Sequence, residues 1–240
     1  MIPVFANAER VARACIPELS GVPLYIVQPR VDGMVKSCML GGRSGCYVKN
    51  LDAMLQPELE QQGRWHGPGA AVVVDAAQIY QTVPYPFNAE RQVIGATMHE
   101  LVHWIEAPER PEPTPSTAAE RYLEFVEHCK SPPECRASIP AEFWSHGDTF
   151  IRLCCHVWWR MAHGGGFVLR PDFLAFAAAY EGLETLSRPI AYVAALDCEF
   201  EPNRDLPLRA LASIAPPDPF VELWKRDEAQ IYQTAAERAA

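Results

Sequence analysis

Three features are missing from the sequence, and each absence argues against a class of protein. No run of 18 apolar residues occurs in the 240-residue chain, so we expect no membrane span. None of the eight cysteines forms a C-x-x-C pair, so there is no zinc-ribbon signature. Lys and Arg number 21 against 30 Asp and Glu. The net charge of −9 argues against a broad electrostatic grip on nucleic acid.

The first twenty residues also lack a basic segment followed by an apolar one, which is the pattern of a secretory signal peptide. We therefore expect a cytoplasmic protein with reduced thiols. Cys154 and Cys155 are adjacent on a predicted helix. Because neighbouring helical residues point about 100° apart, we expect that they cannot both lie in the core. Nothing in the sequence indicates an oligomeric state.

What the sequence does contain is a compact pair of histidines, in His99-Glu100-Leu101-Val102-His103. Residues four apart on a helix lie on one face, so His99 and His103 can share a metal ion. Glu100 points about 100° away from His99, where it can reach a metal-bound water but is poorly placed as a ligand.

The stretch around this motif reads as a helix. Pro84 and Pro86 precede it as breakers, and Asn88 is a candidate N-cap. Apolar residues recur every three or four positions and predict one buried face, beside which the two histidines lie. These apolar residues are Val93, Ile94, Met98, Leu101 and Ile105.

A second motif, His146-Gly147-Asp148-Thr149-Phe150, opens a predicted helix over residues 145–163, which the glycines after His163 end. The buried stripe predicted for this helix consists of Phe150, Leu153, Cys154, Val157, Trp158 and Met161. His-Glu-x-x-His followed by His-Gly-x-x-Phe resembles the SprT-like zinc metallopeptidases. The resemblance implies that His99, His103 and His146 bind one Zn²⁺ per chain and that Glu100 is the catalytic base.

The segment between the two motifs offers an alternative third ligand. It spans 42 residues, 104 to 145, and carries a proline-rich stretch and a predicted helix that begins near residue 118. Gluzincins take their third ligand from a glutamate about twenty residues after the motif. The glutamates at about that distance are Glu120, Glu124 and Glu127. A catalytic zinc needs three protein ligands and one open position, so one of these could replace His146.

The resemblance implies an α+β, zincin-like fold in which a small mixed sheet packs on the motif helix. Short β-rich runs at 23–29, 44–50 and 69–79 precede that helix. We expect a metallopeptidase domain over residues 1–170, with an insertion at 106–142. Residues 171–240 should form a helical extension that packs on the same domain.

The implied function is that of a zinc metalloendopeptidase acting on a polypeptide substrate. The strand within 69–79 is the candidate for main-chain pairing with an extended peptide. Tyr80, Tyr122, His156 and Arg160 have suitable chemistry to stabilise an oxyanion, and nothing in the sequence selects among them. Two other functions stay open: a zincin-fold binding or regulatory module that keeps its zinc without proteolysis, and a metal-free helical adaptor.

Overall fold

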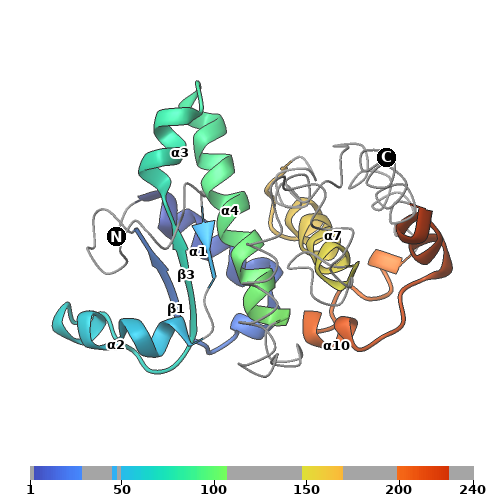
Figure 1. The fold of residues 1–240 in the computed structure, drawn as a ribbon, viewed down its shortest axis with the longest axis horizontal. Coiled ribbons are helices and arrows are strands. Elements are labelled where there is room, and N and C mark those ends of the chain that lie inside the picture. Colours follow the sequence, from blue (N-terminus) through green and yellow to red (C-terminus); the bar gives the residue numbers. More distant parts are fainter. Residues whose placement is uncertain (1–2, 29–44, 48–49, 107–147, 170–198, 227–240) are drawn as a thin grey trace, which may run out of the picture.

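The computed structural model describes residues 3–28, 45–47, 50–106, 148–169 and 199–226, in which helices outweigh a small sheet (Figure 1). The elements are α1 (Pro3–Cys15), the 3₁₀ turn η1 (Pro17–Leu19), β1 (Leu24–Val27), β2 (Gly45–Cys46), α2 (Leu51–Gln61), β3 (Ala70–Val74), α3 (Ala76–Thr82), α4 (Pro86–Glu106), α7 (Asp148–His163) and α10 (Leu208–Ala212). A further helical stretch covers residues 218–226. No helix in these ranges is both long and apolar enough to cross a bilayer.

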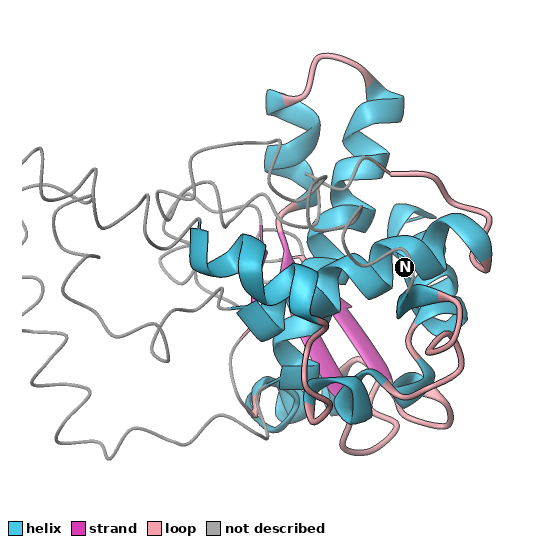
Figure 2. Cartoon of the chain, turned by 90° about the vertical axis from the view of Figure 1, so that its right-hand side faces the viewer, coloured by secondary structure: helices cyan, strands magenta, loops and turns pink. Residues whose placement is uncertain are grey.

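The sheet has the order β1-β3-β2 and is mixed. β1 runs parallel to β3, with Leu24 opposite Ala70, and β2 runs antiparallel to β3, with Gly45 opposite Val74. All five residues of β3 are buried, and alternate ones face opposite sides of the sheet. Val72 joins the core formed with α1 and α4, whereas Val73 joins a smaller core under α2. Helices therefore cover both faces of the strands (Figure 2).

The predicted run 69–79 is one strand only as far as Val74. The buried Asp75 ends it and caps α3, because its Oδ1 accepts hydrogen bonds from the backbone N–H of Gln78 at 2.9 Å and from Nε2 of Gln28 at 3.0 Å. An aspartate at an N-cap satisfies a backbone donor that a helix end leaves open. The second half of the run is thus helix, and the strand expectation was wrong there.

The predicted buried stripe of α4 is confirmed, since each of its five apolar residues is at most 1 % exposed. The expected N-cap was wrong, because the helix begins at Pro86 and Asn88 is its third residue. Proline suits a first helical position, where no backbone N–H is needed. Ala89 donates the first of the turn bonds, to the carbonyl of Tyr85 at 3.0 Å.

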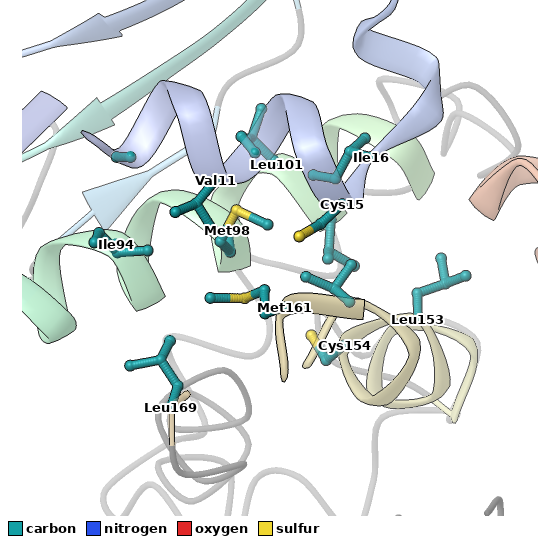
Figure 3. Close-up of a cluster of buried hydrophobic side chains, with 14 of the residues drawn as sticks. Val11, Cys15, Ile16, Ile94, Met98, Leu101, Leu153, Cys154, Met161 and Leu169 are labelled. Atoms are coloured by element: carbon teal, nitrogen blue, oxygen red, sulfur yellow. The ribbon is translucent and has the colours of Figure 1, made fainter. Parts of the chain in front are cut away.

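α7 packs against α1, α4 and α10, and its apolar stripe meets those of α1 and α4 (Figure 3). Of the predicted stripe only Trp158 is half-buried. Both Cys154 and Cys155 are buried, at 2 % and 4 % exposed, so the expectation that they cannot both be core was wrong. A helix covered on several sides has room for both. The glycines end α7 as predicted, with Gly164 and Gly165 donating to the carbonyl of Arg160.

Residues 199–226 pack on α7, with Phe200, Leu208, Leu211 and Phe220 at most 1 % exposed, and α10 also contacts α4. These residues are the described part of the expected 171–240 extension. The expected insertion at 106–142 lies outside the described residues except for Glu106.

Candidate metal centre

His99 and His103, the histidine pair, leave the same face of α4. His99 is 7 % exposed and His103 is half-buried. Their ring centroids are 5.0 Å apart and the ring planes cross at 78°. The buried apolar stripe beside them fixes the rotation of α4 and so aims both rings.

This spacing can be compared with what a shared metal requires. With Zn–N bonds of about 2.1 Å and a tetrahedral angle, two imidazole centroids lie about 5 Å apart. The observed 5.0 Å agrees with that distance. The spacing of the histidine pair is therefore compatible with two ligands of one zinc ion.

Phe150 connects the histidine pair to the second motif. Its fully buried ring stacks on His103 at 4.2 Å between centroids, with an angle of 25° between the planes. The same ring meets His99 at 4.9 Å in an edge-on arrangement. The first turn of α7 thus lies directly against the two imidazoles.

Glu100 is also nearly buried, at 8 % exposed, and packs under the edge of the sheet. A Cβ added to Gly45 of β2 would lie 2.9 Å from Oε1 of Glu100. The carboxylate therefore lies against the main chain of β2, one residue along α4 from His99. Sequence patterns gave no sign of this contact between segments 55 residues apart.

A buried thiol lies close to the same carboxylate. Burial raises the pKa of Cys154 well above its ordinary value, and the charges of Cys155, Glu106 and Glu100 raise it further. Cys154 is consequently a protonated thiol near pH 7. Within the described ranges, no three His, Cys, Asp or Glu side chains are arranged to hold a metal ion. The predicted ligand His146 lies outside the described residues, as do the alternatives Glu120, Glu124 and Glu127.

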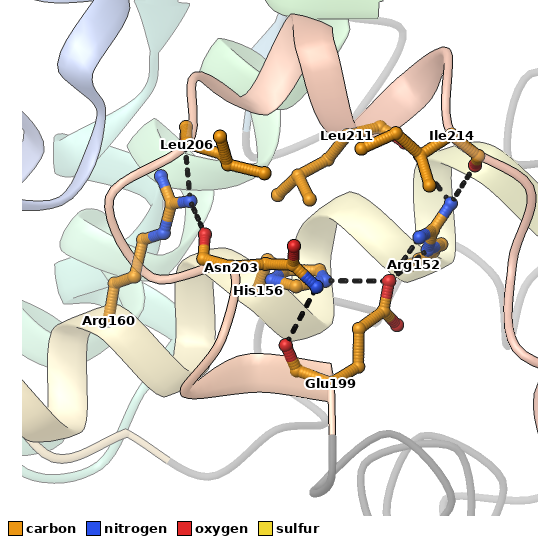
Figure 4. A network of polar contacts seen from close by, with 8 residues as sticks. All are labelled: Arg152, His156, Arg160, Glu199, Asn203, Leu206, Leu211 and Ile214. Atoms are coloured by element: carbon orange, nitrogen blue, oxygen red, sulfur yellow. Dashed lines mark hydrogen bonds and ion pairs between the residues drawn. The ribbon is translucent and has the colours of Figure 1, made fainter.

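The oxyanion candidates on α7 have other partners. Arg160 donates to the carbonyls of Asn203, at 3.1 Å, and Leu206, at 2.6 Å. His156 is fully buried, with Nε2 3.6 Å from Oε1 of Glu199 (Figure 4). Burial lowers the pKa of His156, so it is neutral near pH 7. Both side chains contact the C-terminal segment and hold it to α7, which argues against either of them as the oxyanion stabiliser.

Of the other two candidates, Tyr80 is 43 % exposed on α3, and Tyr122 lies outside the described residues. The strand expected to pair with a peptide is also corrected. β3 is the central strand, with β1 and β2 on its two sides, so it has no edge for another chain. Among the described strands, β1 and β2 lie at the two edges, and β2 also contacts α4.

Comparisons of this sequence and structure with known proteins identified no relative. No family model matches the sequence, and neither the curated proteins nor the solved structures contain a match. The functional assignment consequently depends on the two motifs and on the geometry of the residues around them.

Proposed function

We propose that this chain is a zinc-dependent metallopeptidase of the SprT-like kind that hydrolyses peptide bonds in a polypeptide. The observation that carries the proposal is the contact of Phe150 with both imidazoles, at 4.2 and 4.9 Å. The two sequence motifs are separated by 42 residues, yet this contact brings the last residue of the second motif onto the histidine pair. A chance pair of histidines on a helix would not require that arrangement.

His146 is the third ligand in this proposal. It precedes Asp148, the first residue of α7, by two positions, and two residues of chain span at most about 7 Å. The first turn of α7 already contacts the histidine pair, so covalent linkage favours an approach by His146. The alternatives are less constrained: Glu120 is 14 positions beyond Glu106, where α4 ends.

Three neutral imidazoles and one open position would allow zinc to lower the pKa of a bound water to about 7. The residues of the chain then divide the work. The histidine pair and His146 would hold the metal. Glu100 accepts a proton at its carboxylate from the attacking water and delivers it to the leaving amine, as a general base and then a general acid. Its burial excludes competing solvent from that proton transfer.

Metal analysis and one substitution test the proposal. Purified protein should contain about one zinc per chain, and His99→Ala or His103→Ala should lose it. Glu100→Gln should keep both zinc and fold and lose peptide hydrolysis, because it removes the base and not a ligand. Glu90→Gln is the matched control on α4, where Glu90 accepts a hydrogen bond from Asn7 far from the histidine pair. It should leave hydrolysis unchanged.

The outcomes separate the competing functions. A chain that cannot take up zinc on titration refutes the metallopeptidase and favours the metal-free adaptor. A zinc-loaded wild type that cleaves no peptide favours the non-proteolytic module. Loss of zinc from Glu100→Gln would show that Glu100 is a ligand and that its assigned role is wrong.

A cytoplasmic location is part of the proposal. Cys15 and Cys155 are buried and free, as expected of thiols in a reducing compartment. Burial raises the pKa of Cys15 to about 11 and that of Cys155 to about 12, so both are unreactive thiols near pH 7.

A further inference from the structure

The short strand β2 places a glycine where any other residue would meet the carboxylate of Glu100. Figure 1 shows the β2 arrow beside β3, on the side of α4. A Cβ on Gly45 would lie 2.9 Å from Oε1 of Glu100, 3.1 Å from its Cγ and 3.3 Å from the carbonyl oxygen of Val73. A Cβ contact under 3.0 Å is one that real structures essentially never show, so a side chain here requires something to move.

Position 45 requires glycine because there is no space for a side chain, and not because of its backbone conformation. Gly45 is not among the residues with positive φ, so its backbone conformation is open to any residue. Neither Gly45 nor Glu100 can easily move apart from the other. Hydrogen bonding to β3 sets the register of Gly45 opposite Val74, and Glu100 is 8 % exposed on a helix whose stripe is fully packed.

We propose that Gly45 is a positioning residue, which leaves the room that the Glu100 carboxylate occupies against β2, one residue along α4 from His99. This inference rests on the proposed function, because it assigns Glu100 as the base. An alanine at position 45 would have to open the 2.9 Å contact to at least 3.4 Å, the start of ordinary van der Waals distance, so the carboxylate would move by about 0.5 Å. A misplacement of about 1 Å can cost a hundredfold in rate, so about tenfold is expected in kcat.

The contact itself is tested without metal or substrate, by a double-mutant cycle on zinc-free protein. The urea midpoint is measured for wild type, Gly45→Ala, Glu100→Ala and the double variant. Gly45→Ala should lower the midpoint when Glu100 is present and have little effect in the Glu100→Ala background, where Oε1 and Cγ are gone. Any cost of the 3.3 Å contact with the Val73 carbonyl oxygen is the same in both backgrounds, so it drops out of the difference between them. An equal cost in both backgrounds, or none in either, overturns the proposal.

The positioning role is tested on zinc-loaded protein. Gly45→Ala should lower kcat about tenfold, with KM and zinc content unchanged. Gly164→Ala is the control, since its Cβ would meet only a carbonyl oxygen of α7 at 3.2 Å, and it should keep the wild-type kcat. Coupling in the stability cycle together with an unchanged kcat for Gly45→Ala would overturn the positioning role. A wild type without hydrolysis would refute the proposed function and this catalytic consequence, whereas the stability cycle would still decide whether the contact exists.

Discussion

Removing the carboxylate of Glu199 should strongly destabilise the protein, because it leaves a buried guanidinium without its anion. Oε1 of Glu199 accepts hydrogen bonds from Nε of Arg152, at 3.1 Å, and from its Nη2. The two side chains are 8 % and 4 % exposed (Figure 4). Glu199→Ala leaves a buried guanidinium without its anion, which costs about 3–5 kcal/mol. Glu199→Gln keeps an acceptor oxygen and should cost less, about 1–3 kcal/mol.

Urea unfolding followed by fluorescence measures both costs. A matched control lies two residues further along, where Glu201 is 3.6 Å from Arg204 in a pair whose side chains are 69 % and 59 % exposed. Glu201→Ala should change the free energy of unfolding by less than about 1 kcal/mol. A cost below about 1 kcal/mol for Glu199→Ala would refute the reasoning. It would mean that the hydrogen bonds from Nη1 of Arg152 to the carbonyls of Leu211, at 3.1 Å, and Ile214, at 2.5 Å, are enough to keep the guanidinium buried.

Three further predictions follow from the same structure. Phe150→Ala should lower the free energy of unfolding in urea by about 3–5 kcal/mol, and Phe150→Leu should lower it much less. Both variants should weaken zinc binding in a chelator competition, because both remove the aromatic ring from the histidine pair. Unchanged zinc affinity would refute that role of Phe150. Burial lowers the pKa of His156 from 6.5, so the imidazole binds a proton more readily in the unfolded chain than in the folded one. The free energy of unfolding, measured in urea, should therefore decline as the pH falls below about 6.5. His156→Gln should flatten that pH dependence, and an unaltered dependence would contradict the prediction. His146→Ala should sharply reduce zinc affinity while Glu120→Ala and Glu124→Ala leave it nearly unchanged; the opposite result favours the gluzincin arrangement.

The parts of the fold that the sequence predicted are the long helices with one apolar face. The stripes of α4 and α7 could be recognised because a 3.6-residue period repeats over 21 and 16 residues. The same periodicity placed His99 and His103 on one face beside the α4 stripe, as observed. Local spacing was enough here because the information lies within one element.

The errors occurred where distant segments decide the structure. Ala76 and Ile79 look like a continuation of the β3 strand, but Asp75, which accepts a hydrogen bond from the distant Gln28, ends the strand and starts α3. Cys154 and Cys155 are both buried because residues 199–226 cover a side of α7 that a helix packed on one sheet would expose to solvent. Gly45 meets Glu100 only through the pairing of β2 with β3, and no periodicity within either segment encodes that contact.

The two faces of α7 show how the C-terminal segment and the histidine pair depend on each other. One face is apolar and brings Phe150 onto the pair. The other carries Arg152, His156 and Arg160 at intervals of four, which places them along one side of the helix. Their partners are Glu199 and backbone carbonyls in residues 203–214.

Because the two faces belong to one rigid helix, the contacts on the polar face also fix the rotation that aims Phe150. The network of Figure 4 therefore supports the candidate site, although its side chains contact the C-terminal segment and not the histidine pair. Glu199→Ala should accordingly weaken zinc binding as well as folding, whereas Glu201→Ala should affect neither. A folded Glu199→Ala protein with wild-type zinc affinity would show that packing against α4 and α1 is enough to set the position of α7.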